Sequence, residues 1–256
     1  MFNSPGWASF IDEKMAEGVG AAVSMPRLGA YCEPGTPLAA GQAATFVAPV
    51  ARHGRNIVLS EALYPVLHMI EVVLRNRIHD EFSTHFNDPA WYEQGWVTPR
   101  HVDMVNEAKA DLLRKRKQPD PKRVVAELSF GFWCGMFHAD YERGSGPWPS
   151  LLKKVLPRVP KSWATRSKVR DRLEDARLIR NRVFHHEPIL QFSDLYSKHR
   201  SFVELLGWLS PDARKHIESL CRFNAVFNDK LILTPQTDPE QPGVGEGLQH
   251  DKTDAD

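Results

Sequence analysis

Apolar side chains recur every three or four residues along the range 57–86, and this spacing constrains the fold more than any other feature of the chain. The series consists of Leu59, Leu63, Leu67, Ile70, Leu74 and Ile78. Such spacing places the apolar side chains on one face of an α-helix. No stretch of the sequence alternates cleanly with a period of two, which is the pattern of a half-buried strand. We therefore expect an all-α protein.

Proline, glycine and asparagine residues divide the chain into helices. The helix over 57–86 is expected to carry Pro65 in its first turn or at a kink, and Asn87-Asp88-Pro89 is expected to end it. Further helices are predicted over 99–117, 122–137, 162–186, 192–209 and 211–227, with a loop at 144–147.

Composition indicates three regions. Residues 1–50 are rich in Gly, Ala and Pro, and predict an irregular arm with at most short ordered pieces. Residues 51–233 form the predicted helical domain. Residues 234–256 are acidic and rich in Pro and Gly, and predict a disordered tail.

The net charge of +1 hides an uneven distribution. Without the acidic tail the chain has 32 basic and 26 acidic residues, and the range 153–182 holds eleven Lys and Arg against three acids. A positive field favours a polyanion such as RNA as partner. The alternative is an ordinary solvated basic helix face.

The sequence also argues against several classes of protein. The three cysteines, Cys32, Cys134 and Cys221, are far apart and form no CxxC pair. We therefore expect neither a disulfide framework nor a zinc site. The same cysteine usage predicts a cytoplasmic location. The first residues lack the basic and apolar regions of a signal peptide. Uninterrupted apolar runs are far shorter than the roughly 20 residues that cross a bilayer, so we expect no membrane contact.

The segment that ends the predicted helix over 162–186 carries the strongest functional signal. It reads Arg180-Asn181-Arg182-Val183-Phe184-His185 and is followed by His186, Glu187 and Pro188. On a regular helix Arg180 falls within roughly 20° of Val169, on the apolar face, and an arginine there needs a partner or a ligand. Arg180 and His185 diverge by about 140°, so they can share a site only at a helix end or across a cleft. Pro188 favours such an end.

Arginine and histidine together suit phosphodiester chemistry. The guanidinium binds phosphate oxygens and offsets developing charge, and histidine transfers protons near neutral pH. The 2′-hydroxyl of RNA is an internal nucleophile, so a site of this kind needs no metal. An Arg and a His at this spacing also arise by chance, as a salt bridge and a helix-capping residue. Neighbouring His185, His186 and Glu187 are a poor metal site, because helical ligand pairs are spaced three or four residues apart.

The segment RNRVFHHEP resembles the R-N-x3-H motif of HEPN ribonucleases, and in particular the Abi-like (abortive infection) family. Two more segments resemble that family in the same order. The range 63–79 is similar to its first long helix, and 127–133, which reads ELSFGFW, is similar to its L-S/T-F-G-F-W box.

The resemblance implies a HEPN-type helical bundle that dimerises, so that two motifs form one composite RNA-cleaving site. Arg180 would hold the scissile phosphate, Asn181 would orient the pair and His185 would act as acid or base. The resemblance also implies a toxin or antiphage effector that uses no metal or other cofactor. An antitoxin or a regulatory RNA is a possible partner.

Candidate supporting residues are Glu71, Arg75 and His186. Tyr64, His68, Glu71 and Arg75 form a predicted polar strip beside the apolar face of the first long helix. We expect Glu71 to fix the guanidinium of Arg180, or Arg75 to extend the phosphate site. The alternative is an ion pair between Glu71 and Arg75 at the solvent edge. The aromatic residues of the range 130–137 are expected to be core rather than a surface that stacks bases.

Two other functions remain open from the sequence. In one, the chain is a non-catalytic RNA-binding or sensing module, in which Arg180 and His185 only hold RNA or the dimer. In the other, the motif merely builds a dimer of helical scaffolds.

Overall fold

The computed structural model describes residues 11–32, 46–141 and 147–228, and within these ranges the chain is helical with no strand. The α-helices are α1 (Glu13–Val23), α2 (Met25–Gly29), α3 (Val47–Phe86), α4 (Pro99–Arg114), α5 (Pro121–Glu127), α6 (Phe130–Gly135), α7 (Trp148–Val155), α8 (Arg166–Phe184), α9 (Leu195–Leu209), α10 (Pro211–Leu220) and α11 (Phe223–Phe227). Short 3-10 turns lie at η3 (Trp91–Glu93), η4 (Ala139–Tyr141) and η5 (Lys161–Trp163). The expected all-α class is confirmed.

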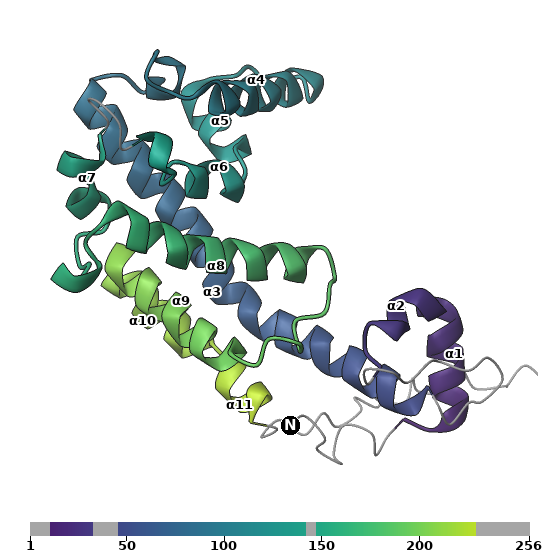
Figure 1. The fold of residues 1–256 in the computed structure, drawn as a ribbon. Coiled ribbons are helices and arrows are strands. Elements are labelled where there is room, and N and C mark those ends of the chain that lie inside the picture. The colour runs from purple at the N-terminus through teal and green to yellow at the C-terminus, as the bar shows by residue number, and fades with distance from the viewer. Residues whose placement is uncertain (1–10, 33–45, 142–146, 229–256) are drawn as a thin grey trace, which may run out of the picture.

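Helix α3 is the axis of the fold, and most other helices pack directly on it (Figure 1). Its apolar series, Leu59 to Ile78, is fully or almost fully buried in the main core. Helices α8 and α9 lie along its middle, whereas α6 and α7 pack near its C-terminal half. The helix ends where Asn87 adopts a left-handed conformation with φ of 50°, as the Asn-Asp-Pro sequence predicts.

A second, smaller core lies at the start of α3. Ala16 of α1, Leu28 of α2, and Phe46 and Val50 pack together there. The expected irregular arm therefore contains two helices in its described part, 11–32, and α3 begins ten residues before the predicted Ile57. The Gly and Ala content concealed these elements, because small residues give little apolar periodicity. Residues 1–10 and 33–45 of the arm, and the predicted tail over 234–256, lie outside the described residues.

Other elements also differ from prediction: α4 ends at Arg114, α8 begins at Arg166, α9 begins at Leu195, and α7 was not predicted. Pro65 lies in the interior of α3, not in a first turn. The segment expected over 122–137 is two helices, because Leu128 is extended and the side chain of Ser129 caps α6 by accepting from the Phe132 N–H. The segment over 211–227 is also divided, at Cys221, which has extended geometry.

Helix α3 contains an 18-residue window long and apolar enough, by composition, to cross a membrane, and 39% of that window is buried inside the protein. The expectation of no membrane contact rested only on uninterrupted apolar runs. This window was missed because it contains up to two charged residues. The core helix of a soluble protein meets the same criteria, so a single such helix is weak evidence for a span.

Candidate active site

The guanidinium of Arg180 lies at the edge of the core, between α8 and α3. Residues Val169, Leu173, Ala176 and Ile179 form the buried face of α8, and Arg180 follows directly beside it with 24% of its side chain exposed. Its Nε lies 3.3 Å from Oε2 of Glu71, whose side chain is 22% exposed. The predicted contact between Glu71 and Arg180 is therefore present.

Arg75 does not join this pair. Its Nε donates to Oδ1 of the neighbouring Asn76 at 3.4 Å, and among the described residues it has no ion pair with Glu71. The alternative of an intrahelical pair at the solvent edge is thus wrong for this structure. Glu71 uses its carboxylate across the helix interface instead.

Aromatic rings cover the other side of the Arg180 guanidinium. Its Cζ lies 4.3 Å from the centroid of the Phe184 ring. Phe184 in turn contacts Tyr64 of α3, with centroids 5.7 Å apart, and Tyr64 stacks on His68 at 5.5 Å. A cation held between a carboxylate and a ring face loses rotameric freedom, so Arg180 is held in one orientation before any ligand arrives.

Helix α8 ends within the motif. His185 is its C-terminal capping residue, and His186 follows with a left-handed φ of 58°. The N–H of Glu187 donates to the carbonyl of Arg182 at 2.8 Å, and the N–H of His186 donates to the carbonyl of Val183 at 3.3 Å. This pair of bonds is a Schellman termination. The prediction that the helix unwinds before Pro188 is confirmed.

The segment after the motif is anchored by Asn56 of α3, which is only 3% exposed. The Oδ1 of Asn56 accepts from the N–H of Ile189 at 2.7 Å, and its Nδ2 donates to the carbonyl of Glu187 at 3.4 Å. One amide side chain thereby binds the backbone on both sides of Pro188. This contact fixes the direction in which the chain leaves His185.

Arg182 faces away from the Arg180 pair and supports the same turn. Its Nη1 donates to the carbonyl of Pro188 at 3.1 Å and lies 3.7 Å from the Glu187 carboxylate. Its guanidinium also sits over the ring of Phe192 at 5.2 Å. Arg182 is therefore a structural residue of the helix end.

His185 and Arg180 are not linked within one chain. His185 is exposed, and among the described residues no hydrogen bond, ion pair or ring contact joins it to Arg180 or to Asn181 through their side chains. Asn181 is half-buried, and its carbonyl accepts from the N–H of His185 at 2.8 Å. The structure thus leaves the two functional groups apart within one chain, as their divergence on the helix predicts.

Helices α3 and α8 run antiparallel here, since Glu71 meets Arg180 and the earlier Tyr64 meets the later Phe184. Together they form a joint surface that carries Arg180 and Phe184 of the motif segment, and we call it the α3–α8 face. On α3 this face consists of Ile57 and the predicted polar strip, which is Tyr64, His68, Glu71 and Arg75. Large apolar side chains are exposed on it, namely Ile57 at 55%, Tyr64 at 46% and Phe184 at 40%. Clustered exposed apolar residues are typical of an interaction surface.

The basic character of α8 is weaker than its composition suggests. Each arginine after Arg166 has a carboxylate oxygen within 3.7 Å. The partners are Asp171, Glu204, Glu174, Glu71 and Glu187. Most of the positive charge along α8 is therefore locally compensated. The number of basic residues along α8 is thus a weaker indication of RNA binding than the contacts of each arginine.

The aromatic box is core, as expected. Phe130, Phe132, Trp133 and Phe137 are each at most 1% exposed. They pack on α3 and η3, and none is available to stack a base. Among the residues that the structure describes, no group of three or more His, Cys, Asp and Glu side chains could hold a metal ion.

Sequence reasoning missed Asn56 and the role of Phe184. Asn56 lies seven positions before Leu63, which puts it on the apolar stripe of α3, and a polar residue on such a stripe signals a buried hydrogen bond. The signal was lost because the helix was predicted to begin at Ile57. Phe184 lies four positions after Arg180, the spacing at which helical side chains meet.

Searches against known protein families, curated proteins and solved structures find no match to this chain. The structure establishes an all-helical fold, and the likeness to HEPN ribonucleases stays a prediction from three sequence segments.

Proposed function

We propose that the protein is a metal-independent endoribonuclease with a HEPN-type bundle, in which two copies form one RNA-cleaving site from Arg180, Asn181 and His185. The observation that carries the proposal is the fixed guanidinium of Arg180. It contacts Glu71 and Phe184, and His185, five residues further along the chain, is exposed. A half-buried arginine held by a carboxylate, in a segment that also carries an exposed histidine, suits phosphodiester cleavage better than it suits packing.

The chemistry would use the 2′-hydroxyl of RNA as nucleophile. A histidine acting as base takes the 2′-hydroxyl proton, the 2′-oxygen bonds to phosphorus, and the bond from phosphorus to the 5′-oxygen breaks. The departing 5′-oxygen receives a proton from a second acid, for which the second copy of His185 is available. The products are a 2′,3′-cyclic phosphate and a 5′-hydroxyl. The Arg180 guanidinium offsets the charge that develops on the phosphoryl oxygens.

A second copy is needed because Arg180 and His185 do not meet within one chain. Exposed Ile57, Tyr64 and Phe184 give the α3–α8 face an apolar centre with the motif beside it. A twofold contact between two such faces would bury these side chains and bring both motifs to one cleft.

A cavity of about 230 Å³ lies beside the helix end. Its walls include Tyr31, His53 and Tyr64, together with Asn56 and His186. Aromatic and imidazole rings stack on nucleobases. We propose that this cavity accepts a base next to the scissile phosphate, which gives His186 a binding role rather than a proton-transfer role.

The test is a cleavage and binding experiment on the full chain. A fluorescent single-stranded RNA and a hairpin RNA are incubated with the wild type, His185→Ala and Arg180→Ala in the presence of a chelator. The same RNA with 2′-deoxy substitution is the chemical control. His216→Ala is the matched control for His185→Ala, because His216 is an exposed histidine on α10, outside the motif.

Cleavage by the wild type and by His216→Ala, its loss in both motif variants, and retained RNA binding by His185→Ala support the ribonuclease. RNA binding with no cleavage by any form would instead support a non-catalytic RNA-binding module. Cleavage of the 2′-deoxy substrate would contradict the internal nucleophile. As an effector that cuts RNA, the protein would act in the cytoplasm under control of an antitoxin or a regulatory RNA.

A further inference from the structure

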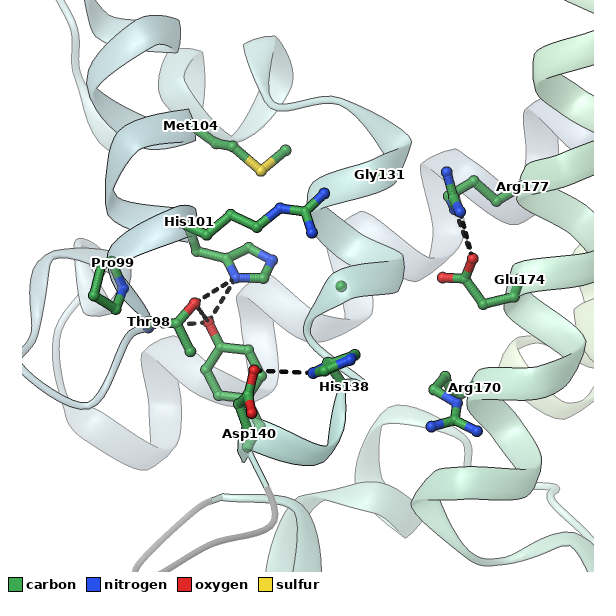
Figure 2. A pocket seen from close by; sticks show the side chains of 13 residues that line it. Thr98, Pro99, His101, Met104, Gly131, His138, Asp140, Arg170, Glu174 and Arg177 are labelled. Carbon is green, nitrogen blue, oxygen red and sulfur yellow. Dashed lines mark hydrogen bonds and ion pairs between the residues drawn. The ribbon is translucent and has the colours of Figure 1, made fainter.

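A larger cavity, of about 710 Å³, is lined by residues of helices α4, α6 and α8 and of the turn η4 (Figure 2). Its volume lies within the roughly 300–1,000 Å³ that is usual for small-molecule sites. Arg170, Glu174 and Arg177 of α8 line one side, and Met104 and His101 of α4 lie across from them (Figure 2). None of these residues belongs to the R-N-x3-H motif.

Arginines are the most numerous charged side chains that line this cavity. Arg100, Arg170 and Arg177 line it against only two carboxylates, Asp140 and Glu174. His138 contributes a further nitrogen, 2.9 Å from Asp140. Arg170 and Arg177 are each paired with a carboxylate, so the cavity carries little net charge, but the planar fork of arginine also matches the oxygens of a phosphate.

The ion pairs that hold two of these arginines are easily exchanged. Arg177 and Glu174 are each 40% exposed, and Arg170 pairs with Asp171, which is 65% exposed. Pairs as exposed as these are screened by water and stabilise the protein only weakly. Arg100 is exposed and has no hydrogen bond or ion pair with the described residues. A phosphate can therefore engage these guanidinium groups at little cost.

The opposite wall is rigid and already satisfied. His101 is buried, and its Nε2 donates to the carbonyl of Phe132 at 3.2 Å. Its Nδ1 accepts from the hydroxyl of Tyr141 at 2.8 Å, and Tyr141 accepts in turn from the Thr98 N–H. Burial lowers the pKa of His101 to about 4, so the ring is neutral. This wall therefore contributes van der Waals contact, and no charge, to the binding of a ligand.

Of the two glycines on α6 that line the cavity, Gly131 leaves it open, whereas Gly135 makes room for the ring of His101. A Cβ at Gly131 would meet only Oγ of Ser129, at 3.5 Å, so packing does not require glycine there. Its φ is not in the left-handed region either. The missing side chain leaves backbone and open volume at the cavity wall, next to Met104 and Pro99. An apolar body of a ligand fits against this wall.

We propose that this cavity binds a small organic phosphate, with its phosphate group on Arg170 and Arg177 and its apolar body against Met104 and the glycine face of α6. The site is separate from the proposed RNA-cleaving site, and it does not depend on that function. A folded RNA strand is the less suitable occupant, because the space lies between three helices.

The experiment measures binding of phenyl phosphate, inorganic phosphate and phenol to the full chain by calorimetry and ligand-observed NMR, with no RNA present. We expect phenyl phosphate to bind most tightly and phenol not to bind. Arg177→Gln should weaken phenyl phosphate binding at least tenfold, and Gly131→Leu should abolish it by filling the cavity. Arg114→Gln, the same change at an exposed position on α4, should bind as the wild type does.

Circular dichroism and thermal unfolding show whether each variant is folded. Gly131→Ala provides a second, milder test, since it adds one carbon where only Ser129 is near, and it should weaken binding without loss of fold. Equal binding by Arg177→Gln and Arg114→Gln would overturn the proposal. So would no binding of phenyl phosphate to the wild type at millimolar concentration, or unchanged binding by a folded Gly131→Leu.

Discussion

The side-chain Oδ1 of Asn56 accepts a hydrogen bond from the backbone N–H of Ile189 at 2.7 Å, across 133 positions of sequence. Ile189 is fully buried, so this N–H has no access to water. The bond joins the N-terminal half of α3 to the exact point where the chain turns away from His185. The geometry of the motif thus depends on a residue that belongs to no motif.

We expect Asn56→Ala to destabilise the fold. The change leaves the Ile189 N–H buried and unpaired, which costs about 1–3 kcal/mol. Urea unfolding measures the loss. Asn106→Ala is the matched control, because Asn106 is exposed in the middle of α4 and alanine favours a helix there. If Asn56→Ala lowers the free energy of unfolding no more than Asn106→Ala does, the hydrogen bonds of Asn56 do not stabilise the fold.

The ion pair between Glu71 and Arg180 should matter more for cleavage than for stability. Both side chains are about a quarter exposed, so a double-mutant cycle of Glu71→Gln and Arg180→Gln should give a coupling free energy of about 1 kcal/mol or less. Glu71→Gln keeps the shape of the side chain but releases the guanidinium. We expect RNA cleavage to fall about tenfold or more, in keeping with the loss of an oriented charge.

Cleavage by Glu71→Gln at the wild-type rate would remove the positioning role of Glu71. Arg77→Gln is the control, because Arg77 is a partly buried arginine of the same helix that lies outside the polar strip. We expect that variant to change neither the coupling free energy nor the cleavage rate by more than about twofold, as for most surface changes.

The two glycines of α6 should respond in opposite ways to alanine. A Cβ at Gly135 would lie 2.5 Å from Nε2 of His101, and that ring is fixed by hydrogen bonds on both sides. Gly135→Ala should therefore destabilise the protein by about 1–3 kcal/mol through overpacking. Gly131→Ala meets nothing closer than 3.5 Å, and should be neutral or stabilise by up to about 1 kcal/mol. Thermal unfolding compares the two, and equal shifts would contradict the packing.

Stability should fall between pH 6.5 and 4. Burial lowers the pKa of both His101 and His199 to about 4, whereas an unfolded histidine has a pKa of about 6.5. The unfolded chain therefore takes up these protons first as the pH falls. The stabilisation is complete above pH 6.5 and is lost progressively towards pH 4, on the order of 3 kcal/mol for each histidine. Urea unfolding at pH 7 and pH 5 measures the change, and an NMR titration midpoint of His101 near 6.5 would contradict it.

The helical class and the central helix could be predicted because their signal is local. The spacing of Leu59 to Ile78 alone places these residues in the core, and Asn87 and Pro188 end their helices as expected. Helices α1 and α2 could not be found in this way, since their small core with Phe46 and Val50 depends on tertiary contacts. The division at Leu128 depended on a cap by Ser129 that competes with an otherwise helical pattern.

For the candidate site, one-helix geometry predicted that Arg180 needs a partner, and the polar strip on α3 supplied Glu71 as the candidate. Phe184 could have been found from its spacing to Arg180 on one helix, whereas the bond partners of Asn56 required knowledge of how α3 packs against the segment after α8. The charge count along the range 153–182 was the least informative signal, because it could not show that Arg170, Arg172 and Arg177 each meet a carboxylate.

The chemical identity of the RNA ends after incubation with purified protein tests the proposed ribonuclease activity most directly. We predict fragments with 2′,3′-cyclic phosphate and 5′-hydroxyl ends from the wild type, formed in the presence of a chelator, and none from folded His185→Ala. Intact RNA with the wild-type dimer, or the same fragments from His185→Ala, would contradict a ribonuclease built on Arg180 and His185.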